Sequence, residues 1–180
     1  MDRLKSIRRG FSLVEAAIVL AVVGLVVAGI WVAAAHVMEQ MRVTEAVKGL
    51  TLMADRTTRL LSRSDIETMG GGDITSFAID SGAAPPSWVY GSIIVDPWGE
   101  PFLLSATAHD SYPTRIDLCF QNVPVGRCMM LVARAPTRDM IGIYASPDFY
   151  TSLPISIDSP VCSVNRAFFC FNYEPKKNIN

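Results

Sequence analysis

Twenty consecutive residues near the start of the chain, Ala16 to Ala35, carry no charge. A helix of this length spans about 30 Å, which is the thickness of the hydrocarbon core of a bilayer. The preceding stretch, Met1 to Gly10, holds four basic residues and one acid. A basic flank stays in the cytoplasm and sends the rest of the chain outward. The pattern therefore predicts a single membrane-spanning segment followed by an exported C-terminal domain.

The helical pattern continues beyond the apolar run. Positions at alternating steps of four and three residues form one helical stripe: Val43, Val47, Leu50, Ala54, Thr57 and Leu61. No proline interrupts residues 1–84, so we expect one helix from about Ser12 to about Arg63. We expect its second half to pack on a globular domain, and its first half to contact lipid or the same helix of other subunits.

The rest of the chain has the pattern of β-structure. The triplet Gly70-Gly71-Gly72 marks a break and begins an irregular connection of roughly two dozen residues. Runs rich in β-branched and aromatic residues predict strands at 91–95, 101–105, 115–120, 141–144 and 167–173, whereas 129–133 fits helix or strand. The polar tail from Glu174 should fray. The predicted fold is α+β, a long helix on an antiparallel sheet.

Composition excludes several classes of protein. The 180 residues suit one domain, or one domain with an appendage, and with half of them hydrophobic and 18% charged the chain is not a disordered one. The formal net charge of −1 gives no indication of nucleic-acid binding. His36 adjoins the apolar run and His109 lies in a polar loop, so no nucleophile–base pair is evident. We expect no enzyme activity, no catalytic residue and no cofactor.

All four cysteines, Cys119, Cys128, Cys162 and Cys170, lie in the last third of the chain. An even number of cysteines in an exported chain favours disulfides. No Cys-x-x-Cys pair occurs and the two histidines are far apart, so we expect no metal site. Four cysteines allow three pairings. Local pairing, Cys119–Cys128 with Cys162–Cys170, would close two short loops.

Three interpretations compete for the N-terminal segment. A cleaved signal peptide would use the small residues 33–35 as its cleavage site, but its apolar core is normally about 7–15 residues long. A plain membrane anchor fits the length, yet it does not explain Glu15, because an acid near a bilayer interior is costly. The third interpretation explains both features. A basic leader ending in Gly10, then Phe11, then Glu15 and an apolar run form the start of a type IV prepilin.

On this motif, Gly10-Phe11-Ser12-Leu13-Val14-Glu15, the chain resembles the type IV pilin and pseudopilin family. The resemblance implies that a prepilin peptidase cleaves after Gly10 and methylates the new amino terminus of Phe11. Glu15 would pair with that amine during assembly. The implied domains are a leader at 1–10, a transmembrane and filament-core helix at 11–36, and a periplasmic or extracellular globular domain at 37–180.

Later motifs resemble those of type IVb pilins in their order. They are Gly82-Ala83-Ala84-Pro85, Asp96-Pro97-Trp98-Gly99, Asn122-Val123-Pro124, Cys128 and Cys162. The resemblance implies a Cys128–Cys162 disulfide, which leaves Cys119 and Cys170 to meet across the sheet. The short leader, Phe11 at the mature start, Glu100 after the turn and four cysteines instead of two depart from that pattern.

The turn after residue 95 also resembles one in major pseudopilins, where calcium-binding residues lie nearby. A calcium site needs about six oxygen ligands, and only Asp96 and Glu100 are candidate acids here. We therefore favour a tight turn with a packed tryptophan.

Three roles follow from the resemblance. The chain would be a pilin that polymerises with other pilin subunits for adhesion, aggregation or conjugative mating. It would otherwise be a pseudopilin of type II secretion, or a minor pilin at a filament tip or initiation complex. Its partners would be the prepilin peptidase and the inner-membrane assembly machinery. It would lie in the bacterial inner membrane before assembly and in an extracellular pilus afterwards, without a nucleic-acid partner.

Overall fold

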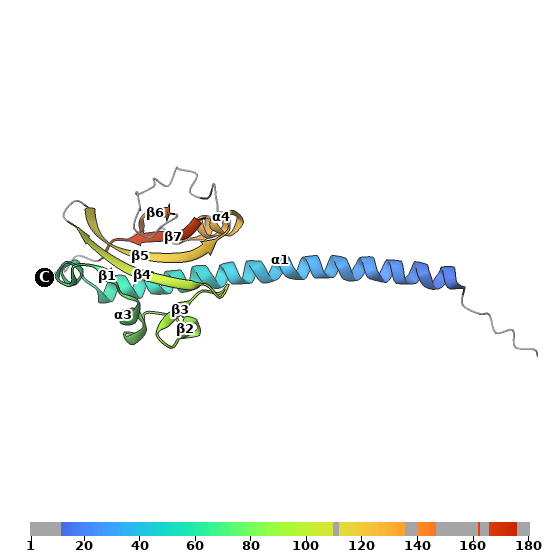
Figure 1. Ribbon diagram of the computed structural model, residues 1–180, viewed down its shortest axis with the longest axis horizontal. Helices are drawn as coiled ribbons and strands as arrows, with labels where there is room; N and C mark the ends of the chain where they lie inside the picture. Colours follow the sequence, from blue (N-terminus) through green and yellow to red (C-terminus); the bar gives the residue numbers. More distant parts are fainter. Residues whose placement is uncertain (1–11, 110–111, 136–139, 147–161, 163–165, 176–180) are drawn as a thin grey trace, which may run out of the picture. The chain divides into compact units, whose positions relative to one another are not determined.

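The computed structural model describes residues 12–109, 112–135, 140–146, 162 and 166–175. The chain divides into two compact units, Met1–Gln40 and Met41–Asn180. The first helix, α1 (Leu13–Leu60), is a single element that contributes to both units (Figure 1). This confirms the long helix expected from the sequence, with its end within three residues of the expected one.

Helix α1 gives way to a second helix, α2 (Arg63–Met69), after a break of two residues. Ser62 caps α2, because its side chain accepts a hydrogen bond from the Asp65 backbone N–H while the Asp65 carboxylate accepts one from the Ser62 N–H. This capping box satisfies backbone donors that a new helix leaves open. The break was expected only at the glycine triplet, so the separation of α2 from α1 was not predicted from the sequence.

The connection after α2 is more regular than expected. It contains β1 (Gly72–Asp73), α3 (Thr75–Asp80), a 3₁₀ helix η1 (Pro86–Trp88) and β2 (Val89–Tyr90). The triplet of glycines turns the chain toward the sheet, and all three have positive φ. At Gly71, an added Cβ would lie 2.8 Å from the Ala106 carbonyl oxygen, so a side chain is excluded there.

The remaining strands form one antiparallel sheet with β1 and β2. They are β3 (Ile93–Val95), β4 (Pro101–His109), β5 (Tyr112–Val123), β6 (Met140–Ser146) and β7 (Arg166–Tyr173). The strand order is β2-β3-β4-β5-β7-β6, and β1 pairs with β4. All five predicted strands are confirmed, and the segment that fitted helix or strand is helix α4 (Val125–Arg134). His109 is the last residue of β4 and not a loop residue.

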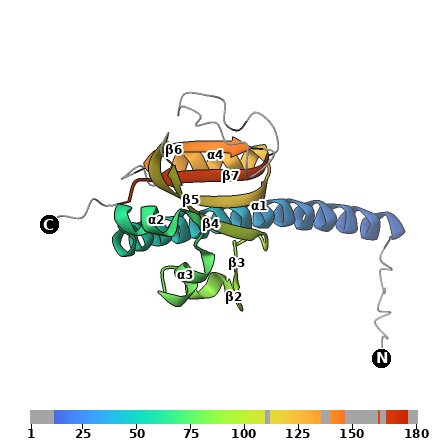
Figure 2. The same cartoon turned by 60° about the vertical axis from the view of Figure 1, so that its left-hand side comes forward.

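Within the second unit, the sheet lies against the part of α1 that follows Gln40 (Figure 2). The strand register brings apolar side chains into rows, such as Phe102 opposite Phe120 and Phe120 opposite Phe169. The predicted stripe of α1 packs on these rows. Its members are buried except Val47, which is half-buried. The helix stripe and the aromatic rows together form the core.

One contact in this core requires a glycine on α1. The Trp88 ring is 2% exposed and packs edge-to-face on Phe102, with ring centroids 5.5 Å apart. An added Cβ at Gly49 would lie 2.4 Å from a carbon of that ring. Gly49 therefore gives the indole its place against the helix backbone.

We expect Gly49→Ala to lower the free energy of unfolding by about 1–3 kcal/mol, because the methyl group overpacks the Trp88 site. The gain in helix propensity, up to about 1 kcal/mol, does not offset this cost. Urea titration of the full chain in detergent micelles, followed by tryptophan fluorescence, measures the change. Gly126→Ala in α4 is the matched control, since nothing lies within 4 Å of its Cβ position. Equal stability of both variants would contradict the packing argument.

Candidate assembly site

The first part of α1 has an apolar surface on all sides. From Leu13 to Val32, the large apolar side chains are 50–86% exposed. It is the one helix in the described part of the chain that is long and apolar enough to cross a membrane, and its most apolar window is not buried. A helix that is apolar all round needs lipid or other apolar helices around it. This segment is therefore the candidate assembly site.

Glu15 lies in the first turn of α1 and is exposed. The helix begins beside it, where the Ala16 N–H donates to the Ser12 carbonyl oxygen at 3.1 Å. A carboxylate in the first turn complements the positive end of the helix dipole. Gly10 and Phe11 lie outside the described residues, so cleavage, methylation and the pairing of Glu15 with the Phe11 amine stay predictions.

Comparison with known families matches this same segment. Residues 5–31 match the family model described as the prokaryotic N-terminal methylation motif. The chain is pilin-like. The motif is that of a class III prepilin N-terminus, and it implies processing by a prepilin peptidase and assembly into pilus-like polymers. No curated protein and no solved structure matches the chain. Pilin-like proteins are typically structural and not enzymes.

The turn between β3 and β4 uses its acidic groups to hold its own shape. Asp96 Oδ1 accepts hydrogen bonds from the backbone N–H groups of Trp98 and Glu100, at 2.9 and 3.0 Å. Glu100 in turn accepts a hydrogen bond from the Asn122 side chain at 2.9 Å. Burial raises the pKa of Asp96, and its two backbone hydrogen bonds act in the opposite direction.

The tryptophan of this turn is packed, as the favoured interpretation expects. The Trp98 ring lies edge-to-face on Phe120, with centroids 6.3 Å apart, and the Arg127 guanidinium lies 5.0 Å from the Trp98 ring centroid. Among the described residues, no cluster of three or more His, Cys, Asp or Glu side chains could hold a metal ion. The arrangement here is that of a tight structural turn.

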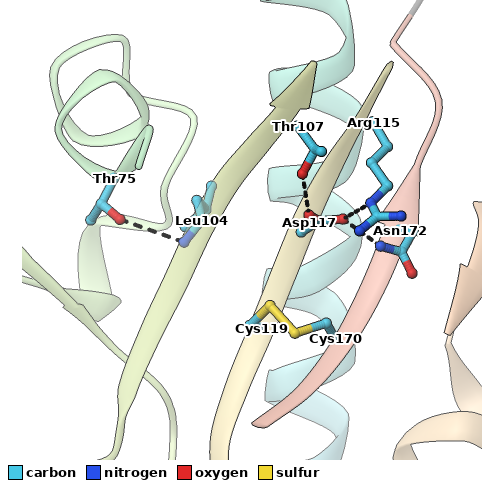
Figure 3. Close-up of a disulfide and its surroundings, with 8 residues drawn as sticks. All are labelled: Thr75, Leu104, Thr107, Arg115, Asp117, Cys119, Cys170 and Asn172. Atoms are coloured by element: carbon cyan, nitrogen blue, oxygen red, sulfur yellow. Dashed lines mark hydrogen bonds and ion pairs between the residues drawn. A yellow bond between two sulfur atoms is a disulfide. The ribbon is translucent and has the colours of Figure 1, made fainter. Parts of the chain in front are cut away.

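Two disulfides cross-link the C-terminal region of the second unit. Cys119 on β5 and Cys170 on β7 are directly opposite in the sheet, with Cα atoms 4.0 Å apart (Figure 3). Cys128 on α4 is joined to Cys162, with Cα atoms 5.6 Å apart. These are the expected pairs, and the local pairing does not occur. They link residues 51 and 34 positions apart, and a loop of such length gives roughly 4 kcal/mol of stabilisation in the chain-entropy estimate.

A buried polar cluster lies beside the Cys119–Cys170 disulfide, on the face of the sheet opposite α1 (Figure 3). Asp117 accepts hydrogen bonds from Thr107 at 3.0 Å and from Asn172, and pairs with Arg115 at 3.1 Å. Burial raises the pKa of Asp117 above its ordinary value, and the charge of the nearby Arg115 offsets only part of this rise. This cluster was not predicted from the sequence, because its members come together only through the register of β4, β5 and β7.

The Asp96 turn gives a direct test of its structural role. We expect Asp96→Ala to lower the free energy of unfolding by about 1–3 kcal/mol, since two backbone N–H groups lose their acceptor. Asp96→Asn keeps an oxygen at the Oδ1 position and should lose less. Thermal unfolding of the full chain in micelles, with and without added calcium, measures both effects. A stabilisation by calcium that Asp96→Ala abolishes would contradict this interpretation.

Proposed function

We propose that this pilin-like chain is the structural subunit of a type IVb pilus, which polymerises through its N-terminal helix for adhesion, aggregation or conjugative mating. The proposal rests on the exposed apolar part of α1, which lies almost entirely within the N-terminal methylation motif matched at residues 5–31. A segment that is apolar on every side suits lipid before assembly and a bundle of identical helices afterwards. One surface thus serves both the membrane-anchored precursor and the filament.

The proposal assigns a role to each part of the chain. Residues 1–10 are the leader that the prepilin peptidase removes, and methylation then modifies the amine of Phe11. Residues 11–36 hold the subunit in the inner membrane and later form the filament core. Residues 37–180 form the globular domain, which lies in the periplasm before assembly and on the extracellular pilus afterwards. The inner-membrane assembly machinery transfers the subunit between these two environments.

Glu15 supplies the proposed assembly contact. An unpaired carboxylate in a low-dielectric filament core is strongly unfavourable, whereas a paired one is tolerated. Cleavage after Gly10 creates a cation at Phe11, four residues away in sequence. Pairing of this amine with Glu15 of a neighbouring subunit would set the axial register of an incoming pilin.

The type IVb assignment rests on the C-terminal region. Disulfide Cys128–Cys162 encloses the segment that such a bridge bounds in type IVb pilins. The alternatives, a type II secretion pseudopilin or a minor pilin, share the N-terminal motif and differ in abundance within filaments. Electron microscopy of purified surface filaments, with mass spectrometry of their main subunit, tests the proposal. Filaments composed mainly of another subunit would contradict the role as a major pilin.

We expect the mature protein to begin at Phe11 with a methylated amine. Intact-mass analysis of the protein from membranes or filaments measures both changes. Gly10→Val should leave the precursor uncut in the membrane, because the peptidase needs a small residue at this position. Gly24→Val, inside the apolar run, is the control and should be cut normally. A mature start at His36, or an uncut wild-type chain, would contradict the pilin assignment.

Glu15→Ala should be cleaved and inserted normally but should assemble poorly, because the Phe11 amine loses its partner. Filament yield, measured by shearing and immunoblotting against the level of mature subunit in membranes, reports this loss. Glu45→Ala removes an exposed carboxylate from the second part of α1 and should leave the yield unchanged. Wild-type yield from Glu15→Ala would show that Glu15 does not set the register.

A further inference from the structure

We infer that Trp31 anchors the chain at the outer boundary of the membrane's hydrocarbon core, and thereby places Phe11 at the inner boundary. The inference rests on the proposed function, because it requires α1 to span a membrane. It goes further by assigning a lipid-contact residue and a register within the bilayer. The partner is the interfacial layer of the outer leaflet, where carbonyl and phosphate groups meet the acyl chains.

Trp31 has no packing role in the described structure. Its side chain is 77% exposed, whereas Trp88 is buried in the core and Trp98 is half-buried against Phe120. It is the only aromatic residue between Ser12 and Ala35. An indole combines a large apolar body with one N–H donor, which finds acceptors at the headgroup level but none in hydrocarbon. Trp31 therefore has a specific reason to lie at a boundary.

The length of the helix supports this register. Trp31 lies eighteen residues after Leu13, the first residue of α1, and a helix rises by about 27 Å over eighteen residues, close to the thickness of the hydrocarbon core, about 30 Å. With Trp31 at the outer boundary, α1 begins near the headgroups of the cytoplasmic leaflet, and the basic residues Arg8 and Arg9 of the precursor precede that end in the sequence by four to five residues. Anionic lipids attract basic residues there by about 1 kcal/mol each. Trp31 at the outer end of the segment and the basic residues at its inner end thus favour the same position of the helix in the bilayer.

An alternative register would centre the uncharged run 16–35 in the bilayer. That register moves the helix by four to five residues, or about 6–8 Å, and takes the Trp31 N–H into hydrocarbon. It would spare Glu15, which in the Trp31 register lies about one helical turn, or roughly 5–6 Å, inside the inner boundary. This cost is reduced because helical side chains tilt toward the N-terminus, so the Glu15 carboxylate extends toward the cytoplasmic headgroups.

The depth of Trp31 decides between the two registers. The full precursor is reconstituted into phosphatidylcholine–phosphatidylglycerol vesicles that contain lipids brominated either near the acyl carbonyls or near the bilayer centre. The emission of Trp31 is obtained by subtracting the spectrum of Trp31→Phe, in which Trp88 and Trp98 remain. Trp31→Phe combined with Val27→Trp is the matched control, because it places the indole one helical turn deeper.

We expect Trp31 to lose more emission to lipids brominated near the carbonyls than to those brominated near the centre. The Val27→Trp control should show a shift toward quenching by the deeper bromines. Strongest quenching of Trp31 by the central bromines would overturn the proposed register while leaving membrane insertion intact. Absence of quenching at both positions 31 and 27 would overturn the register together with the membrane anchor itself.

Discussion

The exposed apolar surface of α1 is the constraint on which the rest of the account depends. Each square ångström of apolar surface left in water costs about 25 cal/mol, and the large apolar side chains from Leu13 to Val32 are all at least half exposed. Nothing in the described structure covers them. Lipid covers such a segment in a membrane, and identical helices cover it in a filament. The N-terminal methylation motif matched at residues 5–31 implies processing by a prepilin peptidase and assembly into pilus-like polymers.

The second part of α1 is apolar on one face only. From Val43 onward the apolar positions form a stripe, and this stripe is buried against the sheet. Gly49 admits the Trp88 ring to the helix backbone. On the opposite face of the sheet, Asp117 and the Cys119–Cys170 disulfide join the strands. The globular unit is thus held together from both faces, by apolar packing against α1 on one side and by polar and covalent links on the other.

Much of this arrangement could be predicted from the sequence. The long helix and its buried stripe follow a helical period, and the five longer strands lie in runs rich in β-branched and aromatic residues, both of which can be detected in a single sequence. The cysteine pairing came from resemblance to type IVb pilins, because spacing alone left three possibilities open. The elements β1, α3, η1 and β2 were missed, since all four lie in the stretch after the glycine triplet that the sequence predicted to be an irregular connection. The Asp117 cluster was missed because its partners lie on three strands, and the sequence does not specify their register.

The break between α1 and α2 was not predicted either, although two residues in the sequence mark it. Ser62 and Asp65 form a capping box at the start of α2. A serine followed three residues later by an acidic residue is a known sequence signal for the start of a helix. Because no proline occurs in residues 1–84, one uninterrupted helix was expected instead. The glycine triplet was correctly recognised as a break, and its physical reason is the close approach of Gly71 to the backbone of β4.

The accessibility of a single thiol in the apolar segment tests the central claim most directly. All four native cysteines are in disulfides, so Ala21→Cys introduces one reactive thiol, and Ser81→Cys provides an exposed control in the globular unit. We expect a water-soluble maleimide to label Ser81→Cys in both membranes and filaments. We expect Ala21→Cys to be labelled in neither until the protein is denatured, because lipid or neighbouring helices cover it. Rapid labelling of Ala21→Cys in intact filaments would contradict the account, because the apolar helix would then not form the filament interior.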